Sequence, residues 1–151
     1  DNQVKIKLEC SLEDFEVPWR KTYEKHGVEP THKLSELKGY EEKLEGGVKF
    51  HAAYFKGEPI SSICEFNADS DKCRLLYYIN TDPANKHLQS LSLLISMYVS
   101  ECNRQSVKAI DFGTSLLSSQ PNLNQEGIIR FKENIGCSSY YRDKTEYKLM
   151  L

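Results

Sequence analysis

A carboxylate and two tyrosines fall in segments that the sequence predicts to be neighbouring strands. Glu65 belongs to a strand expected from Pro59 to Phe66, and Tyr77 and Tyr78 belong to one expected from Lys72 to Thr81. A carboxylate can take a proton and a tyrosine hydroxyl can give one, so Glu65 and Tyr78 are candidates for general base and general acid. The alternative is that the tyrosines are core residues with a satisfied hydroxyl.

The histidines and cysteines show no spacing typical of a metal site. The five cysteines are odd in number and form no Cys-x-x-Cys pair, which argues against a disulfide framework and a zinc knuckle. We therefore expect no metal, small buried cysteines and a protein of the reducing cytoplasm. Solvated or locally hydrogen-bonded side chains are the ordinary interpretation of the four histidines, His26, His32, His51 and His87.

The composition is typical of one globular domain, with 151 residues of which 39% are hydrophobic and 28% charged. No apolar run approaches the roughly 18 residues that span a bilayer, and no signal-peptide pattern opens the chain. The net charge of −2 disfavours general nucleic-acid binding, although a local basic patch remains an alternative. Because the sequence begins at Asp1 without a methionine, we expect it to be part of a longer protein.

The first third of the chain is expected to form one strand and two helices. Alternating apolar and charged residues predict a half-buried strand over residues 4–9. A Ser-x-x-Asp capping box at Ser11 begins a helix that Gly27 ends, and Pro18 predicts either a kink or two short helices there. A second helix is expected over residues 33–44.

Three strands with short connections follow. The first covers residues 48–56, and a two-residue turn at Gly57-Glu58 makes the next, residues 59–66, its antiparallel partner. The third, residues 72–81, is apolar on both faces and is expected to be central in the sheet. An amphipathic helix is then expected from Asn85 to about Arg104.

The last part of the chain is expected to hold a short strand at 107–112, a helix at 122–135 that Gly136 ends, and a closing strand at 138–149. The element order is thus β-α-α-β-β-β-α-β-α-β. An antiparallel meander followed by a strand-helix-strand crossover requires a mixed sheet, which gives an α/β protein.

This order resembles the GNAT superfamily of acyl-CoA-dependent N-acyltransferases over nearly the whole chain. Four stretches resemble the bacterial branch related to Fem-type peptidoglycan aminoacyl transferases, namely 26–32 (HGVEPTH), 51–54 (HAAY), 111–113 (DFG) and 124–136 (NQEGIIRFKENIG). The resemblance implies a single GNAT-like domain over residues 1–151. It also implies that this is the second of two such domains, with an N-terminal companion.

The resemblance further implies where an acyl donor binds. In the superfamily the strand before the long helix carries a bulge and diverges from the next strand, and the donor lies in the gap. The donor phosphates lie at the N-terminus of the long helix. Here the family's glycine-rich loop is replaced by Asn-Lys-His-Leu-Gln-Ser at 85–90, which departs from the pattern. The implied donor-binding residues are Ile79, Asn80, Thr81, Lys86, His87 and Gln89.

Four polar residues after the long helix are candidates for substrate binding. Each has an ordinary structural alternative. Asp111 can bond the N–H groups of its own loop, and Asn124 can cap a helix. Glu126 is favourable near a helix N-terminus, and Lys132 can be solvated or paired with an acid.

The function implied by the resemblance is transfer of an acetyl or aminoacyl group to an amine, with Glu65 as base and Tyr78 as acid. The donor would be acetyl-CoA or another acyl donor such as aminoacyl-tRNA, and the acceptor a small-molecule or peptide amine. One alternative is a non-catalytic GNAT-like module that binds a peptide, a sugar or a partner domain. Another is that activity requires the missing N-terminal domain.

Overall fold

A computed structural model of the chain describes residues 3–69, 72–115 and 125–139. The chain divides into two compact units, Asp1–Gly113 and Thr114–Leu151, whose positions relative to one another are not determined. Each unit is therefore described by itself. The first unit carries the sheet and the helices α1 to α3, and the second carries α4.

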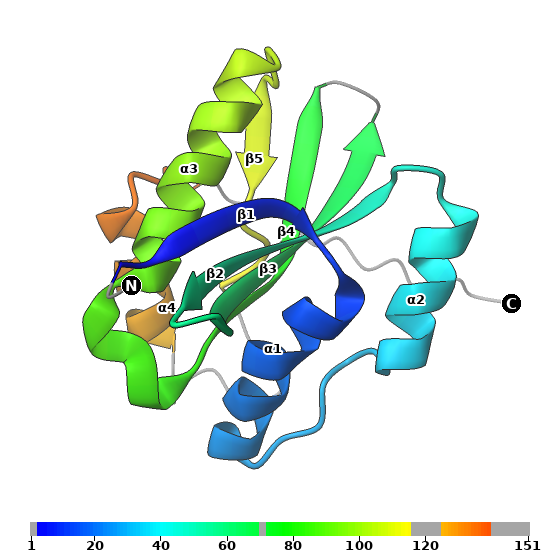
Figure 1. The fold of residues 1–151 in the computed structure, drawn as a ribbon. Helices are drawn as coiled ribbons and strands as arrows, with labels where there is room; N and C mark the ends of the chain where they lie inside the picture. The colour runs from blue at the N-terminus through cyan, green and yellow to red at the C-terminus, as the bar shows by residue number, and fades with distance from the viewer. Residues whose placement is uncertain (1–2, 70–71, 116–124, 140–151) are drawn as a thin grey trace, which may run out of the picture. The chain divides into compact units, whose positions relative to one another are not determined.

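Five strands form one mixed sheet in the order β1-β2-β3-β4-β5 (Figure 1). The first four strands pair antiparallel, and β5 pairs parallel to β4, so the predicted mixed α/β sheet is confirmed. As expected, β4 is an interior strand, between β3 and β5. The strands are β1 (Lys5–Cys10), β2 (Val48–Phe55), β3 (Glu58–Asp69), β4 (Cys73–Thr81) and β5 (Ala109–Asp111).

The turn between β2 and β3 lies one residue earlier than predicted. Phe55 pairs with Glu58, so the two turn residues are Lys56 and Gly57 rather than Gly57 and Glu58. Both have positive φ, +52° at Lys56 and +88° at Gly57. This is the backbone of a type I′ turn, whose twist matches that of the flanking strands. The requirement for positive φ at both positions therefore sets the turn, with Gly57 at its second position.

Helix α1 (Leu12–His26) is a single helix in spite of Pro18. Ser11 caps its N-terminus by accepting a hydrogen bond from the Asp14 N–H, and Gly27 ends it in the left-handed conformation, both as predicted. The predicted alternative of two short helices is wrong. Pro18 lies on the same buried face as Phe15 and Trp19, and burial of this face against the sheet outweighs the one hydrogen bond that proline removes.

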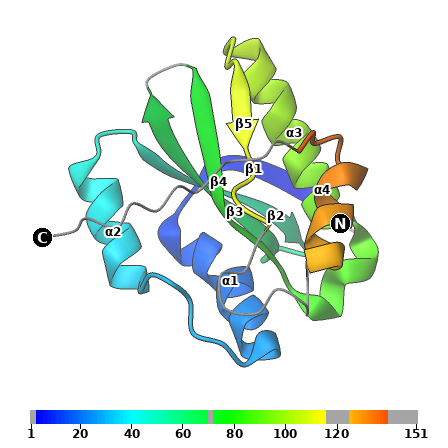
Figure 2. The ribbon, with the colours of Figure 1, turned by 180° about the vertical axis from the view of Figure 1, so that it is seen from behind.

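The helices cover the sheet on both faces (Figures 1 and 2). On one face, α1 and α2 (Leu34–Lys43) enclose a core that includes Phe15, Leu37 and Phe50. On the other, α3 (Ser90–Arg104) encloses a core that includes Ile63 and Leu94. A residue of the sheet therefore belongs to one of two separate interiors, according to the face from which its side chain projects.

The long helix begins later than the sequence predicts. Residues Pro83–Leu88 form a 3₁₀-helix, and Gln89, with φ +52°, separates it from α3. The amphipathic pattern continues through this break because Leu88 and Leu91 are both partly buried, which is why the pattern alone did not reveal it. Strand β5 is also shorter than the predicted 107–112.

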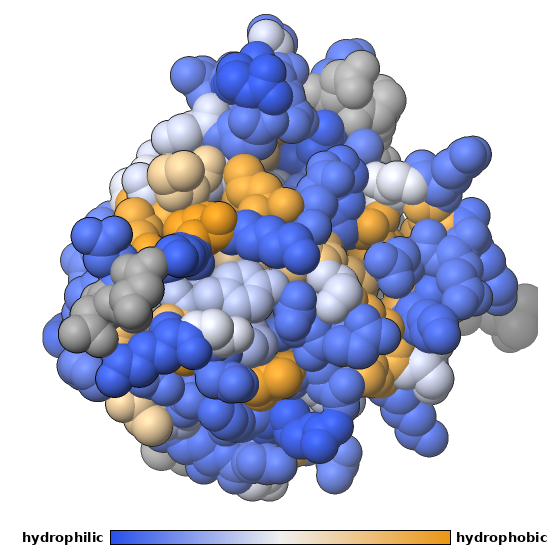
Figure 3. All heavy atoms as spheres, viewed as in Figure 1, coloured by the Kyte–Doolittle hydropathy of each residue, from blue (hydrophilic) through white to orange (hydrophobic). Residues whose placement is uncertain are grey.

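The second unit contains α4 (Gln125–Asn134), which Gly136 ends with φ +87° as predicted. Ile128 of this helix is 37% exposed. The predicted strand at 138–149 falls almost entirely outside the described residues, and residues 138 and 139 are not in a strand. Across the described parts of the chain, the helices are all too short or too polar to span a bilayer. The face drawn in Figure 3 is mostly hydrophilic, with smaller hydrophobic groups between the polar side chains.

Candidate functional site

Strand β4 carries a bulge at Tyr77. Cys64 pairs with Tyr78 and Glu65 pairs with Leu76, so Tyr77 has no partner of its own in β3. A bulge directs two successive side chains to the same side of the sheet. Tyr77 accordingly lies beside Phe66, with 5.5 Å between ring centroids, and Tyr78 lies beside Trp19, with 6.3 Å. Both tyrosines thus face the α1–α2 side, and Tyr77 is 39% exposed.

Immediately before this bulge, β4 parts from β5. The two strands pair only from Cys73 to Leu75, within the residues that the structure describes. The Thr81 N–H instead donates to the Thr22 hydroxyl of α1 at 3.2 Å. The proton of that hydroxyl is shared between the Thr81 C=O at 3.2 Å and the Pro18 C=O at 2.8 Å. Because residues in an antiparallel strand alternate in direction, the main-chain groups of Ile79 point the same way as those of Thr81, away from β3.

The side chains of the other predicted donor residues on β4 are engaged inside the fold. Asn80 is buried and donates to the Ser62 hydroxyl at 3.3 Å. The Thr81 hydroxyl lies 2.9 Å from that of Ser61, which in turn lies 2.7 Å from that of Ser90 at the start of α3. These hydroxyl contacts fix the end of β4 relative to α1 and α3.

We expect Thr22→Val to destabilise the protein by about 1–3 kcal/mol, because it leaves the N–H and C=O of Thr81 without their partner. Thr22→Ser keeps the hydroxyl and should cost much less. The free energy of unfolding in urea measures both changes. Equal stabilities for Thr22→Val and the parent protein would show that water serves these groups as well as Thr22 does.

His32, in the connection between α1 and α2, meets Tyr78 above the bulge. The His32 main-chain N–H donates to the Tyr78 hydroxyl at 3.1 Å, and its ring Nδ1 lies 3.3 Å from the same oxygen. The imidazole also contacts the rings of Tyr77 and Tyr40, with centroids 5.2 and 5.8 Å away. An imidazole is thus held, partly exposed, against the bulged strand.

Burial raises the pKa of Tyr78 to about 12, although the hydrogen bond from the His32 main chain opposes this. The hydroxyl is therefore protonated near neutral pH. It would give its proton reluctantly to a thiolate, whose conjugate acid has a pKa of about 8.5. The phenol is better suited to orienting its partner by hydrogen bonding than to donating a proton.

Glu65 lies in the other interior, on the α3 face. Its two carboxylate oxygens are engaged by Arg74 Nε at 2.9 Å and His51 Nε2 at 3.1 Å, and all three residues are buried. Burial alone would raise the pKa of Glu65, but the hydrogen bond from His51 and the positive charge of Arg74 outweigh it, so the pKa is lower than usual. A carboxylate stabilised in this way is a weak base.

The tautomer of His51 follows from its second partner. The Glu9 main-chain N–H donates to His51 Nδ1 at 3.1 Å, so Nδ1 has no proton. The proton of the neutral ring is then on Nε2, where it is donated to Glu65. Glu9 has φ +61° at the β1 bulge, and His51 therefore ties this irregular residue to the buried Glu65–Arg74 pair.

A pocket of about 220 Å³ borders this buried group, and Tyr98 of α3 also lines it. Burial and the adjacent Glu65 carboxylate raise the pKa of Tyr98. The Tyr98 hydroxyl makes no hydrogen bond of good geometry with a described residue. Glu65 and Tyr78 are thus on opposite faces of the sheet, and the structure does not bring them together around one reacting atom.

The turn between β4 and α3 holds the other predicted donor residues. Lys86, His87 and Gln89 are exposed. Gln89 precedes α3 without a side-chain capping bond, and its main-chain carbonyl accepts from the Leu93 N–H. The first N–H groups of α3 are therefore uncapped by a side chain. Asp82, which begins this turn, is paired with Lys21 of α1 at 2.7 Å.

The predicted substrate residues divide between the two units. In the first unit, the Asp111 carboxylate accepts from the Gly113 N–H at 2.7 Å, which is the contact that the structural alternative predicts. In the second, Glu126 is exposed and lies 3.8 Å from Arg130, and Lys132 donates to the Thr114 carbonyl and the Ser115 hydroxyl. Asn124 lies outside the described residues.

Sequence reasoning missed three participants, His32, Arg74 and His51. His32 occurs in a stretch used for the family resemblance, but only the fold reveals its contact with Tyr78. Arg74 and His51 give no local signal, because their partner Glu65 is distant in sequence from His51 and separated by a turn from Arg74. No group of three metal-ligating side chains occurs in the part of the chain that is described.

Comparison with known proteins finds matches in fold but none in sequence. In sequence, the chain matches no protein-family model and no curated protein. In structure, it is similar to an acetyltransferase of the GNAT family from Staphylococcus aureus Mu50, with a TM-score of 0.67 and 16% identity over 89% of this chain and 84% of that one. It is also similar to ribosomal-protein-alanine N-acetyltransferase from Brucella melitensis biovar Abortus 2308, with a TM-score of 0.67 and 12% identity over 97% and 100%.

A third similar structure is AAC(6')-Iy in complex with the bisubstrate analogue CoA-S-monomethyl-acetylneamine, with a TM-score of 0.66 and 16% identity over 99% of this chain and 100% of that one. These similarities cover nearly the whole chain. The chain therefore has the α/β GNAT fold, as its element order predicts. Nothing in the comparisons singles out the Fem-type branch.

Proposed function

We propose that the protein is an N-acyltransferase that moves an acyl group from a thioester donor to an amine. The observation that carries this proposal is the Tyr77 bulge, placed where β4 parts from β5 on a GNAT fold. The main-chain groups of Ile79 point into this divergence. They would form with the amide groups of an acyl-CoA arm the hydrogen bonds that a neighbouring β-strand would otherwise form.

In the proposed reaction, the amine nitrogen attacks the thioester carbonyl carbon and a carbon–nitrogen bond forms. The amine proton passes to a base and the carbon–sulfur bond breaks. The leaving thiolate then takes a proton from the protonated base or from solvent, so that the products are an amide and a thiol. Glu65 has a structural role in this reaction, because His51 and Arg74 bind both of its carboxylate oxygens on the face of the sheet opposite Tyr78.

The base that we propose is His32. With its proton on Nδ1, the ring donates to the Tyr78 hydroxyl oxygen, and Nε2 has a free lone pair that can accept a proton from the amine. The phenol would then hold the productive tautomer, which is a role suited to a hydroxyl with a raised pKa. His32 also lies beside the exposed ring of Tyr77, where an acceptor can approach.

The donor phosphates are proposed to bind the turn before α3. Lys86 supplies a positive charge there, and the α3 N-terminus has N–H groups that no side chain caps. Gln89 adopts the left-handed conformation for which glycine is usual, so at this one position the backbone has a conformation that a glycine-rich loop would also allow.

We also propose an acceptor class, an alternative donor and a compartment. The acceptor is a small-molecule or peptide amine, and the Fem-type branch would bring aminoacyl-tRNA as an alternative donor and an N-terminal companion domain. A bacterial cytoplasm is the proposed compartment, since all five cysteines are free thiols.

Deletion of Tyr77 tests the donor site. The deletion gives a regular β3–β4 ladder in which Cys64 and Glu65 keep their partners and faces. We expect acetyl-CoA to bind at least tenfold more weakly, because removal of the bulge should close the divergence into which the Ile79 N–H and C=O point. Losing two ligand hydrogen bonds of about 1 kcal/mol each changes affinity by that order. Isothermal titration with acetyl-CoA, a longer acyl-CoA and an aminoacyl-tRNA mimic measures the effect.

Tyr77→Ala is the matched control, because it keeps the extra residue and removes only the side chain. It should retain most of the donor affinity. If no donor binds the unaltered protein, the proposal fails for this chain. If a donor binds equally well with Tyr77 deleted, the bulge is not the donor site.

The absence of glycine at 85–90 favours one competing function, a GNAT-fold module that binds a ligand without catalysis. Leu88 and Gln89 bring side chains to a place where phosphate binding favours a bare backbone. The two functions differ in one measurement, the release of free thiol from acyl-CoA in the presence of a panel of amines. Donor binding without any thiol release would favour the module.

A further inference from the structure

A cavity of the first unit lies at the edge strand β1, away from the Tyr77 bulge on the interior strand β4. It is a groove of about 580 Å³ on the outer side of β1 and β2, lined by residues that include Lys5, Lys7, Asp14, Tyr54, Lys56 and Gly57. A volume of this size is in the range of small-molecule sites, roughly 300–1,000 Å³. It is separate from the donor site proposed above, which is built on β4 and α3.

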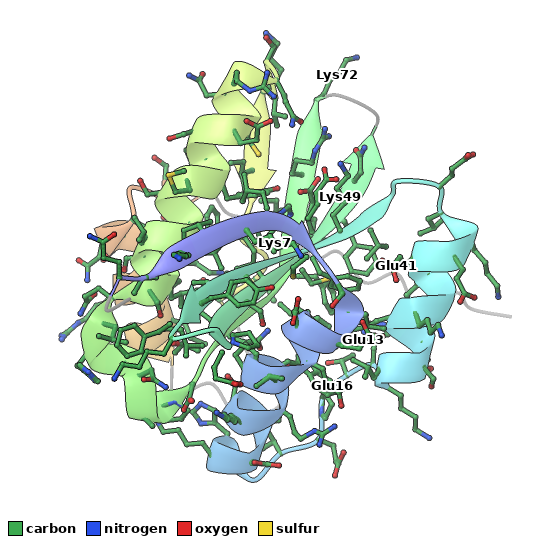
Figure 4. All side chains as sticks on the ribbon, in the orientation of Figure 1. Lys7, Glu13, Glu16, Glu41, Lys49 and Lys72 are labelled. Carbon is green, nitrogen blue, oxygen red and sulfur yellow. The ribbon has the colours of Figure 1, made fainter. Side chains whose placement is uncertain are left out.

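The groove exists because α1 leaves one strand uncovered. Helix α1 packs mainly against β3, β4 and β2, so the β1 side chains on the same face have no helix above them. Lys5 and Lys7 project from this face, since they pair across the sheet with Tyr54 and Ala52. Figure 4 shows Lys7 on β1 and Glu13 at the start of α1, the helix that bounds the groove.

Positive charge converges on the groove from two separate segments. Lys5 and Lys7 come from β1, and Lys56 comes from the β2–β3 turn, where the positive φ of a type I′ turn fixes its position. Lys56 Nζ lies 5.2 Å from the centre of the Phe55 ring. Neither Lys7 nor Lys56 forms an ion pair with a described acid.

The acidic groups nearby do not cancel this charge. Asp14 is the one carboxylate among the lining residues, and it accepts a hydrogen bond from the Tyr54 hydroxyl at 2.7 Å. On the neighbouring turn of α1, Glu16 is paired with Arg20. The ammonium groups of Lys7 and Lys56 therefore belong to a groove whose described lining has one carboxylate, and the phenol of Tyr54 forms part of the wall.

Edge strands often carry lysines that prevent pairing with another chain. That role accounts for Lys5 and Lys7 on β1, but it does not account for Lys56, which comes from the turn and meets them across the same groove. We infer that this groove binds a small dianion, a phosphate monoester or a dicarboxylate, through Lys7 and Lys56, which lie on either side of Lys5 along the strands.

The inference is tested on the full chain by following main-chain amide shifts in ¹⁵N NMR during titration with inorganic phosphate and, separately, with succinate. Saturable shifts should appear at Ile6, Lys7 and Gly57. The double variant Lys7→Gln/Lys56→Gln should weaken binding at least fivefold. Lys38→Gln/Lys43→Gln, which removes two exposed lysines from α2, is the charge-matched control and should leave it unchanged.

The two anions distinguish the two ligand classes, because a phosphate site should bind phosphate more tightly and a dicarboxylate site should bind succinate more tightly. Saturating CoA distinguishes this groove from the proposed donor site. It should abolish the amide shift changes that the anions cause at Ser90–Ser92 and leave those at Gly57 unchanged. Shifts confined to the start of α3, no saturable shift with either anion, or equal affinity in the double variant would each overturn the inference. Those results would leave edge protection as the role of the lysines.

Discussion

Arg74→Ala should lower the free energy of unfolding by about 3–5 kcal/mol, because it leaves the buried Glu65 carboxylate without its positive partner. Arg74 Nε lies 2.9 Å from Glu65 Oε1, and both side chains are at most 9% exposed. Arg74 Nη1 also donates to Asn67 at 2.9 Å, so the substitution removes a second, partly buried contact. Urea denaturation followed by fluorescence of the single tryptophan, Trp19, measures the change.

Arg104→Ala is the matched control for this prediction. Arg104 forms an ion pair with Glu101 in the last turn of α3, where its side chain is 72% exposed, and such exposed pairs contribute little. We expect almost no change in unfolding free energy. A similar loss in both variants would mean that removing any arginine destabilises the protein, and that the buried pair has no special weight.

The cost of Arg74→Ala should depend on pH. In the unaltered protein the pKa of Glu65 is lowered, so its contribution to stability is complete above the unfolded-state value, about 4.3, and is lost as the pH falls through the folded-state value. Without Arg74, the buried carboxyl is best protonated, which costs free energy at pH 7 and little below pH 4. The difference between the two proteins should therefore shrink from pH 7 to pH 3. A difference that does not change with pH would show that lost packing, and not charge, is the cause.

The order of helices and strands can be predicted from the sequence because it depends on local periodicity. The amphipathic stripe of α3, the Ser11 cap and the glycine stops at Gly27 and Gly136 all act within a few residues. The predicted β2–β3 turn is one residue too late, and the predicted start of α3 is too early. Both boundaries depend on a positive φ, at Lys56 and at Gln89, and neither residue type indicates a positive φ in the sequence. Both errors lie at boundaries, and neither changes the topology.

The site was harder to predict because it depends on which face of the sheet each side chain meets. Glu65 and Tyr78 are on adjacent strands, and a regular alternation counted from sequence gives no reason to separate them. The Tyr77 bulge brings Tyr77 and Tyr78 to one face, while pairing across β3 leaves Glu65 on the other. Its partner His51 comes from β2 and cannot be found by spacing. Long-range pairing, which no local pattern encodes, therefore decides which groups can act together.

The placement of His32 against the bulged strand gives the prediction with the largest expected effect on activity. His32→Gln should lower kcat by about 100-fold or more, measured as thiol release with the best donor and amine of the unaltered protein. Glutamine keeps a similar length and a polar end group but cannot accept the amine proton. The main-chain N–H of residue 32 still bonds Tyr78, so the melting temperature should change little.

His26→Gln is the control for this substitution, because His26 is exposed in the last turn of α1 and touches no part of the proposed site. Its kcat should match that of the unaltered protein. Tyr78→Phe adds a second measurement, since losing the phenol frees the imidazole tautomer, which should lower kcat less than His32→Gln and alter the pH profile. If His32→Gln keeps its kcat while donor binding persists, the base is another group and His32 serves only to pack the α1–α2 connection against β4. If kcat falls while donor binding persists, the proton passes through this imidazole, and the two faces of the sheet have distinct tasks: stability at Glu65 and chemistry at His32 beside Tyr77 and Tyr78.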